Sequence, residues 1–172
     1  MGNIMDDLPV IIDKLTGVYN HRYFQETIET EFRKSYEDSK VLSLMLIDID
    51  SLQRFNYDYG HVEGDNLLIR IGEITKNLLR DTDLLCRYGG DEFAVICMNT
   101  GKKEAIVIAE KIRQSVEDYD FIAENKPVKM TVSIGLATFP DDCDTKAKLI
   151  WVADENTYLA KKSGRNRIFY KT

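Results

Sequence analysis

Two short acidic segments carry the most suggestive chemistry of this chain. Asp48 and Asp50 follow the apolar run 41–47, and Asp91 and Glu92 follow a pair of glycines. Mg²⁺ prefers oxygen ligands and is usually held by one or two carboxylates together with phosphate oxygens. The first two acids would share a face if the strand continued, and a divalent cation would relieve the repulsion between the other two. Taken alone, each segment is also typical of a solvated acidic turn, and for 48–50 the turn is the favoured interpretation.

A second set of residues has the chemistry to recognise a nucleobase. Asn56 presents a hydrogen-bond donor and an acceptor, whereas Asp65, at the end of the segment 60–65, presents acceptors only. Guanine carries N–H donors at N1 and N2, so an aspartate facing them with an asparagine nearby would select guanine over adenine. Asp65 equally suits the first turn of a helix, where the dipole stabilises a carboxylate. The spacing by itself favours this second alternative.

Basic residues gather in the segment 161–167, which contains Lys161, Lys162, Arg165 and Arg167. Arginine offers phosphate oxygens a planar fork, and lysine offers them a point charge. Cations at the C-terminal end of a helix also stabilise the helix dipole without any ligand. The cluster therefore indicates either a phosphate site or a stabilised helix end.

The elements that position these residues follow from the spacing of apolar side chains. Helical spacing predicts helices, and short apolar runs bounded by turn residues predict strands. Gly89 and Gly90 predict a hairpin turn between two strands, because glycine tolerates a positive φ. Helices that alternate with strands predict an α/β or α+β sandwich. We expect helices at 17–36, 64–79, 103–116 and 146–162, and strands at 41–47, 84–87, 93–98, 129–139 and 167–170.

The composition narrows the class of protein. The length of 172 residues suits one domain, and the net charge of −6 argues against binding a nucleic acid polymer. Three cysteines without a CxxC pair favour a reducing cytoplasm over a disulfide framework. No apolar run approaches the ~18 residues that a membrane span needs. Residues 1–13 lack the basic and apolar regions of a secretory signal.

Five motifs in a fixed order together resemble the GGDEF domain family. The segment 87–93, with the sequence RYGGDEF, matches the signature of that family. The opening motif of the family resembles residues 13–22, with His21 in place of an arginine. Three further motifs are similar to residues 48–65, 133–137 and 153–166. We therefore expect residues 13–172 to form one GGDEF domain and residues 1–12 to be a linker or N-terminal stub.

The resemblance implies a fold close to the catalytic core of adenylyl cyclase. That core is a ferredoxin-like βαββαβ arrangement in the α+β class, with a central mixed or antiparallel sheet flanked by helices and a β-hairpin that carries the GGDEF residues. The resemblance also implies a homodimer in which two GTP-loaded domains face each other. Each 3′-hydroxyl would attack the α-phosphate of the opposing GTP, which yields cyclic di-GMP and pyrophosphate. A sensory domain N-terminal to this one is expected in the parent protein, which would be cytoplasmic or anchored to a membrane.

The resemblance also implies roles for individual residues at the metal. Asp48, the carbonyl of Ile49 and Asp91 would hold Mg²⁺ or Mn²⁺. Asp91 would also be the candidate proton acceptor, so that it counts among the catalytic residues. Glu92 would assist the metal site as the second catalytic residue.

Further roles concern the substrate, GTP. Asn56 and Asp65 would read guanine, and His61 would lie near the nucleotide. Lys161 and Arg165 would bind the β- and γ-phosphates. These assignments favour the functional alternative for segments whose spacing alone is ambiguous.

Arg80 and Asp83 form a four-residue R-x-x-D pattern shortly before the signature. It resembles the inhibitory site of the family, where cyclic di-GMP binds and arrests the domain. Arg80 would bind guanine or phosphate, and Asp83 would accept hydrogen bonds from guanine. The pattern by itself is often only an ion pair at a helix end.

Some residues depart from the family pattern. Gln53 stands where the family usually has a lysine that is thought to stabilise the transition state, and Leu52 and Tyr57 replace a phenylalanine and an aspartate. Arg54 would point about 100° away from the position of Gln53 on a helix. Two alternatives to a diguanylate cyclase follow. One is a weakly active or inactive domain that senses GTP or cyclic di-GMP, and the other is a cyclase that makes an adenine-containing dinucleotide, against which Asp65 argues.

Overall fold

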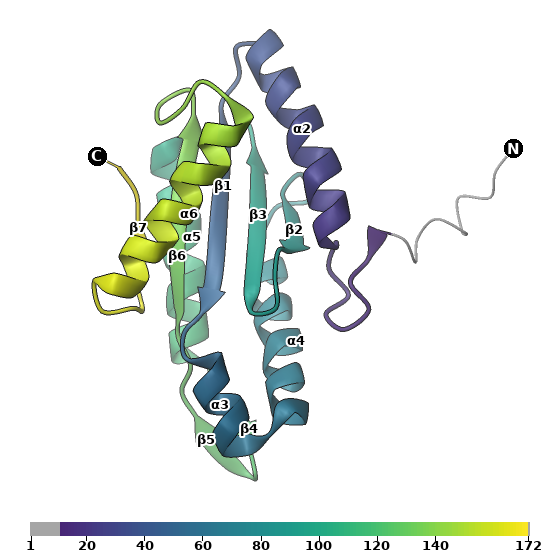
Figure 1. Ribbon diagram of the computed structural model, residues 1–172, viewed down its shortest axis with the longest axis vertical. Coiled ribbons are helices and arrows are strands. Elements are labelled where there is room, and N and C mark those ends of the chain that lie inside the picture. The colour runs from purple at the N-terminus through teal and green to yellow at the C-terminus, as the bar shows by residue number, and fades with distance from the viewer. Residues whose placement is uncertain (1–10, 172) are drawn as a thin grey trace, which may run out of the picture.

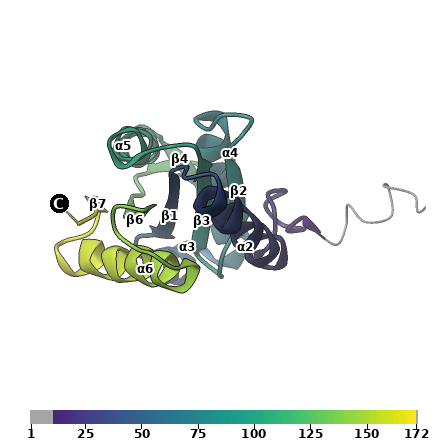
Figure 2. The ribbon, with the colours of Figure 1, turned by 90° about the horizontal axis from the view of Figure 1, so that it is seen from above.

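A computed structural model describes residues 11–171, which form a five-stranded sheet covered by helices on both faces, and a small two-stranded sheet (Figures 1 and 2). The strands are β1 (Leu42–Ile49), β2 (Leu84–Arg87), β3 (Glu92–Met98), β4 (Phe121–Ala123), β5 (Lys126–Val128), β6 (Val132–Phe139) and β7 (Ile168–Phe169). The helices are α2 (His21–Glu37), α3 (Leu52–Tyr59), α4 (His61–Asn77), α5 (Lys102–Asp118) and α6 (Lys146–Lys162). Most of the expected linker 1–12 lies outside the described residues.

The large sheet has the strand order β2-β3-β1-β6-β7. Neighbouring strands are antiparallel, except for β6 and β7, which are parallel. Strands β1, β2, β3 and β6 and the helices between them give the ferredoxin-like βαββαβ order, and β7 is an addition at the edge. The α+β class and the ferredoxin-like core expected from the sequence are therefore confirmed.

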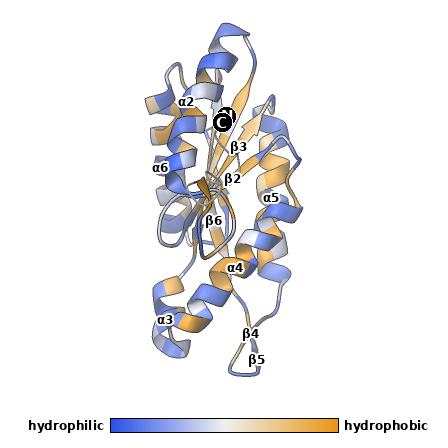
Figure 3. Ribbon diagram, turned by 90° about the vertical axis from the view of Figure 1, so that its right-hand side faces the viewer, coloured by the Kyte–Doolittle hydropathy of each residue, from blue (hydrophilic) through white to orange (hydrophobic). Residues whose placement is uncertain are grey.

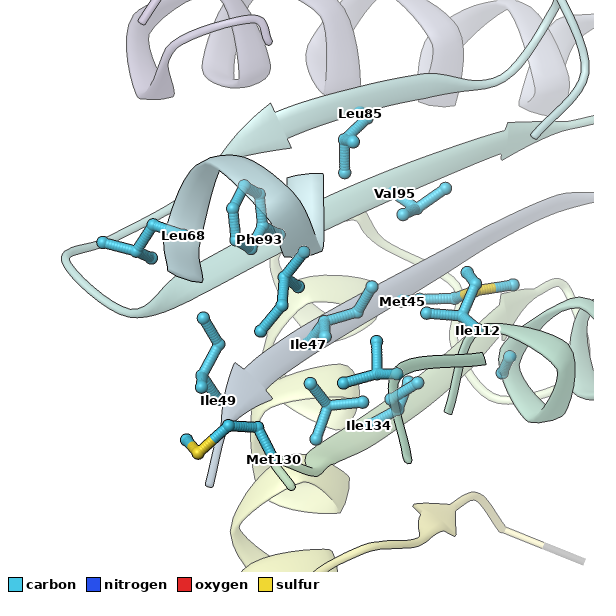
Figure 4. Packing of buried hydrophobic residues seen from close by; sticks show 14 of the residues in the cluster. Met45, Ile47, Ile49, Leu68, Leu85, Phe93, Val95, Ile112, Met130 and Ile134 are labelled. Atoms are coloured by element: carbon cyan, nitrogen blue, oxygen red, sulfur yellow. The ribbon is translucent and has the colours of Figure 1, made fainter. Parts of the chain in front are cut away.

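Strand β1 lies in the middle of the sheet and is buried along its whole length. Its side chains alternate between two hydrophobic cores, as the pleat of a strand requires. Ile47 lies in the core that includes Ile112 of α5, whereas Leu44 lies in the core that includes Phe24 of α2. Figure 2 shows α4 and α5 on one side of the sheet and α2 and α6 on the other. Figure 4 shows the first core at close range, and Figure 3 shows how apolar residues follow the strands.

Helix α6 packs very closely against β6 at Gly135. A Cβ atom at this position would lie 2.1 Å from the carbonyl oxygen of Ala153. Nearby, the side chain of Asn156 donates a hydrogen bond of 2.7 Å to the carbonyl of Leu136. These contacts fix the position of α6, whose last turn carries Lys161, relative to the sheet.

The first described helix begins later than the sequence predicted. Helix α2 starts at His21, whereas the apolar pattern suggested a start near Gly17. Gly17 instead closes a turn, with a φ of +70° and an N–H that donates to the carbonyl of Asp13 at 2.9 Å. The side chain of Asn20 then accepts a hydrogen bond of 2.9 Å from the N–H of Tyr23 and caps the helix. The turn and the cap explain the later start.

One short helix and one short β-hairpin were not predicted from the sequence. Helix α3 has only eight residues, and Gly60, with a φ of +88°, separates it from α4. Helix α4 consequently starts at His61 and not at Gly64. The strand expected from Lys129 begins at Val132, because the residues before it belong to the β4–β5 hairpin and its connection. Such short segments contain too few residues for a clear period.

The hairpin that carries the GGDEF residues is confirmed, because β2 pairs with β3 and places Arg87 opposite Phe93. The reason given for its glycines was wrong, since neither Gly89 nor Gly90 has a positive φ. A Cβ atom on Gly89 would lie 2.6 Å from a carboxylate oxygen of Glu92. Gly89 is therefore needed because a larger residue would clash with the Glu92 side chain, and not because of its main-chain conformation.

Within residues 11–171, no helix has the length and apolar character that crossing a membrane would demand.

Candidate functional site

The C-terminal end of β1 and the β2–β3 turn lie side by side at one end of the sheet (Figure 1). In the register of β1 and β3, Asp48 lies opposite Glu92. The N–H of Ile49 donates a hydrogen bond of 3.1 Å to the carbonyl of Asp91. Antiparallel pairing thus brings together the four residues that the resemblance assigned to the metal and to proton transfer.

Asp48 is a carboxylate in an unfavourable environment. It is only 3% exposed, and its burial raises its pKa to about 6. The Lys161 ammonium group forms an ion pair with Asp48 and opposes this rise, while the negative charges of Asp91 and Glu92 add to it. Burial also raises the pKa of Glu92, and the neighbouring Asp91 raises it further. Additional positive charge at this cluster would therefore stabilise it.

Lys161 reaches the cluster from the last turn of α6, where it meets Asp48. A pocket of about 400 Å³ adjoins this pair, and Glu92 and Tyr158 are among the residues that line it. Arg165 follows four residues after Lys161, in the turn beyond the helix, and is exposed. The two cations that the resemblance assigned to phosphates therefore come from one short segment beside the acidic cluster.

The oxygen donors of this cluster suit a hard divalent cation. Across the described residues, no three His, Cys, Asp or Glu side chains form a ready-made metal cage. Mg²⁺ seldom has such a cage, because it keeps several waters and takes the rest of its ligands from one or two carboxylates and from substrate phosphates. Asp48, Asp91 and the Ile49 carbonyl fit this pattern, in which the cation binds together with the substrate.

Asp50 does not belong to the acidic cluster, although it lies two residues from Asp48. Strand β1 ends between them, so the condition for a shared face is not met. The buried carboxylate of Asp50 accepts hydrogen bonds from the hydroxyls of Thr131 and Ser133, both at 2.7 Å, and from the N–H of Asn166 at 3.0 Å. Asp50 thus joins three segments of the fold, a role that the sequence did not reveal.

Asn56 lies at the corner between α3 and α4. Its Oδ1 atom is buried and finds no hydrogen-bond partner within residues 11–171. A Cβ atom on Gly64 would lie 1.8 Å from this oxygen, so the amide occupies space that only glycine leaves open. A buried acceptor without a partner costs on the order of 1–3 kcal/mol. Asp65 and His61 of α4 are exposed near this corner, so both are open to a nucleotide, whereas the buried oxygen of Asn56 is reached only if the corner rearranges.

Arg80 and Asp83 occupy the turn between α4 and β2. The main-chain N–H of Arg80 donates to the carboxylate of Asp83 at 3.1 Å, whereas its guanidinium group forms an ion pair with Glu104 of α5. The side chains of Arg80 and Asp83 therefore do not form the simple ion pair with each other. Asp83 is 7% exposed, its burial raises its pKa, and its Oδ1 atom has no partner in the described part of the chain. Both residues line a pocket of about 310 Å³.

Arg87 holds the hairpin turn, a role that was not predicted from its sequence position. Its guanidinium group donates to the carbonyls of Gly89 at 3.2 Å and Gly90 at 2.8 Å. A third contact of 3.2 Å reaches the carboxylate of Asp13 in the opening motif. A cation two residues before a pair of glycines is the signal that would have pointed to this role.

Two departures from the family pattern have visible consequences. Gln53 is exposed on α3, and the neighbouring Arg54 forms an ion pair of 2.8 Å with Asp58. Arg54 is thus directed to a neighbour on its own helix, in a largely exposed pair that holds it only weakly. His21 lies with its Nδ1 atom 2.8 Å from the carbonyl of Tyr88, so it contacts the start of the hairpin turn.

A ferredoxin-like sheet with carboxylates at the end of its central strand and beside a hairpin is the arrangement that the resemblance to nucleotidyl cyclases implied. Comparison with known proteins agrees. The sequence matches the family described as "Diguanylate cyclase, GGDEF domain" over residues 10–167. The chain therefore belongs to the GGDEF domain family, whose members named diguanylate cyclase are nucleotidyltransferases.

Individual relatives point the same way. Diguanylate cyclase A of Treponema denticola is 35% identical over 150 residues, which are 86% of this chain and 40% of that protein. The uncharacterized protein YhcK of Bacillus subtilis is 38% identical over 160 residues, which are 92% of this chain and 45% of that protein. The chain thus spans less than half the length of these curated relatives. The solved GGDEF domain of DgcB from Caulobacter crescentus, in complex with c-di-GMP, is 26% identical with a TM-score of 0.89, over 93% of this chain and 92% of that one.

Proposed function

We propose that this domain is a diguanylate cyclase, which condenses two GTP molecules into cyclic di-GMP and releases pyrophosphate. The observation that carries the proposal is the buried Asp48 beside Asp91 and Glu92, with Lys161 in contact from α6. Such a cluster has excess negative charge, and the divalent cation that accompanies a triphosphate supplies the positive charge that it lacks. Membership of the GGDEF family supports the same conclusion.

The guanine base would be recognised at the corner between α3 and α4. The buried Oδ1 atom of Asn56 has no partner among residues 11–171 and would accept an N–H of the base. Asp65 would accept from N1–H and N2–H, and adenine offers no matching pair of donors. His61 would lie beside the nucleotide.

The triphosphate would lie between the acidic cluster and the end of α6. Asp48, the Ile49 carbonyl and Asp91 would hold Mg²⁺ or Mn²⁺, with Glu92 in support. A bound divalent cation neutralises phosphate charge and favours departure of pyrophosphate. Once Asp48 has another counter-ion, Lys161 would turn to the β- and γ-phosphates together with Arg165, and these two cations would fix the leaving group in line.

The reaction joins two nucleotides held by two domains. The 3′-oxygen of one GTP forms a bond to the α-phosphorus of the other, and the bond from that phosphorus to the bridging oxygen of the β-phosphate breaks. The proton of the 3′-hydroxyl passes to Asp91, the candidate acceptor, and pyrophosphate leaves with the electron pair. A second, symmetric step closes the ring. Because each domain binds one GTP, a homodimer with facing sites is required.

Product inhibition is the second part of the proposal. Cyclic di-GMP would bind at Arg80 and Asp83, whose unpartnered Oδ1 atom would accept a guanine N–H. Arg80 would have to release Glu104 to meet the product. The pocket of about 310 Å³ that these residues line leaves space on one side of the turn.

The organisation of the parent protein is proposed from the family alone. Residues 13–172 would act as the cyclase domain, and residues 1–12 would connect it to an N-terminal sensory domain. The domain would work in the cytoplasm, where GTP is available, whether or not the parent is anchored to a membrane. No nucleic acid polymer would bind, because the net charge is −6.

One observation favours a second candidate function. Gln53 is neutral where the family usually has lysine, and Arg54 is engaged by Asp58. A domain that binds GTP or cyclic di-GMP but turns over slowly or not at all would then act as a sensor module. A cyclase and a sensor differ in turnover and not in binding.

The decisive experiment incubates purified chain at high concentration with GTP and MgCl₂, after removal of copurified nucleotide, and resolves the products by chromatography with mass detection. Cyclic di-GMP from the native chain and none from Asp91→Ala would support the cyclase. GTP binding without product, even after fusion to a dimerising segment, would overturn it in favour of the sensor. Gln53→Lys is the matched variant, and it should increase turnover without a change in GTP affinity.

A further inference from the structure

The turn that carries Arg165 has a strained main chain. Gly164, Arg165 and Asn166 have φ values of +112°, +61° and +48° in succession. Glycine adopts such angles easily and asparagine tolerates them, but Arg165 loses on the order of 1–2 kcal/mol in this region. A strained residue of this kind persists only where surrounding contacts fix it.

The contacts that fix this turn converge on Asn166. Its main-chain N–H donates to Asp50 at 3.0 Å. Its side-chain oxygen accepts from the guanidinium group of Arg113 at 2.7 Å, and its side-chain nitrogen donates to the carboxylate of Glu117 at 2.7 Å. Both ends of the amide are therefore engaged by α5, and the main chain is engaged by the segment after β1.

The partners of Asn166 are themselves held firmly. The Arg113 side chain is only 14% exposed and forms ion pairs of 2.6 Å with both Glu110 and Glu117. The carboxylate of Asp50 accepts hydrogen bonds of 2.7 Å from two hydroxyls, those of Thr131 just before β6 and of Ser133 in β6. The turn is thus attached to α5 and, through Asp50, to the segment after β1 and to β6.

The two aspartates at the end of β1 hold the two ends of one segment. Asp48 pairs with Lys161, and Asp50 accepts from Asn166. Arg165 lies between these two anchors, in the strained part of the segment. We propose that Asn166, through Asp50 and Arg113, is a positioning residue that presets Arg165 for the β- and γ-phosphates of GTP. The inference rests on the proposed function, because it assumes that Arg165 binds those phosphates.

Presetting matters because contacts that fix the main chain of Arg165 before the ligand arrives avoid the cost of ordering this turn on binding. If Asn166 acts only through Arg165, its loss should weaken ligands that carry β- and γ-phosphates and spare those that do not. A purely structural role would weaken all nucleotides alike. The contrast between a triphosphate and a monophosphate therefore separates the two roles.

The test is a double-mutant cycle with Asn166→Gly and Arg165→Ala. Glycine keeps the left-handed main chain accessible and removes only the side-chain contacts. The probes are 3′-deoxy-GTP, which lacks the attacking hydroxyl, and 3′-deoxy-GMP, each titrated with Mg²⁺ by calorimetry. We expect Asn166→Gly to weaken the triphosphate about fivefold or more, to leave the monophosphate within about twofold, and to add nothing when Arg165 is already alanine.

Arg113→Met is the second variant, and it removes one partner of Asn166 from outside the turn. It should give the same selective loss, also abolished by Arg165→Ala. Equal losses for both nucleotides, or losses that add to that of Arg165→Ala, would refute the positioning role of Asn166. The proposed phosphate site at Arg165 would not be affected by that result. If Arg165→Ala leaves triphosphate binding unchanged, or the native chain does not bind the triphosphate, the proposed phosphate site falls and the inference falls with it.

Discussion

The substitution Asp48→Asn should stabilise the metal-free domain while it abolishes the candidate metal site. The carboxylate of Asp48 is 3% exposed, and its pKa is raised from 3.8 to about 6. A pKa above the ordinary value means that the folded state disfavours the charged form. The contribution of this carboxyl to stability is fully present below about pH 4 and is lost as the pH rises through about 6. An uncharged amide of the same shape avoids this loss.

The size of the effect follows from the size of the pKa change. Each pKa unit corresponds to about 1.4 kcal/mol, so a rise from 3.8 to about 6 corresponds to about 3 kcal/mol at pH 7. For a chain of this length, 1 kcal/mol shifts the melting temperature by about 2–4 °C. Asp48→Asn should therefore melt roughly 6–12 °C higher at pH 7, and this advantage should shrink steadily as the pH approaches 4.5.

The assay is thermal melting together with urea unfolding, in EDTA and at several pH values between 4.5 and 7.5, with Asp50→Asn as the matched control. Asp50 accepts three hydrogen bonds, and the NH₂ group of an asparagine cannot accept any of them. Asp50→Asn should therefore destabilise the domain by about 1–3 kcal/mol. Two identical substitutions, two residues apart, should thus have opposite signs. A stabilisation by Asp48→Asn that is the same at every pH, or a loss of stability, would refute the reasoning.

Three further substitutions follow from close contacts. Gly135→Ala would place a Cβ atom 2.1 Å from a main-chain oxygen of α6, and thermal melting should show a loss of at least about 2 kcal/mol. Gly64→Ala would place a Cβ atom 1.8 Å from Oδ1 of Asn56, and calorimetry should show GTP binding weakened about tenfold with the melting temperature nearly unchanged; unaltered affinity would remove this asparagine from the base site. Arg87→Met would release two carbonyls of the hairpin turn, and kinetics should show kcat reduced about tenfold with little change in KM, whereas a change in KM alone would contradict a role in holding the hairpin.

Long elements with a clear apolar period were predictable from the sequence. The central strand was expected at 41–47 and spans Leu42–Ile49, and the helix expected at 146–162 matches Lys146–Lys162. The short helix α3 and the β4–β5 hairpin were not predicted, because they hold too few residues to show a period. The first helix was misjudged at its start because a turn at Gly17 interrupts an otherwise helical pattern.

The candidate site was predictable as a set of residues but not as a set of contacts. Motif order pointed to Asp48 and Asp91, and strand pairing places Asp48 opposite Glu92 and the N–H of Ile49 on the carbonyl of Asp91. The different fate of Asp50 depends on where β1 ends and on hydroxyls far away in the sequence. The pairing of Arg80 with Glu104 likewise depends on how α5 packs, which no local pattern encodes.

The distribution of unmet polar groups supports a binding function for two separate segments of the fold. In the part of the chain that the structure describes, three buried side-chain atoms lack a hydrogen-bond partner, and they belong to Asn56, Asp83 and Asn156. The first two lie in the segments that the sequence associated with guanine and with the product, and the third sits between α6 and the sheet, where its amide nitrogen is bonded. Elsewhere in the sheet, the buried hydroxyl of Ser43 is bonded to both a carbonyl and the hydroxyl of Thr138, each at 2.8 Å. Two of the three unmet acceptors thus lie where N–H donors of a nucleotide are expected, and a ligand that supplies those donors would stabilise the fold.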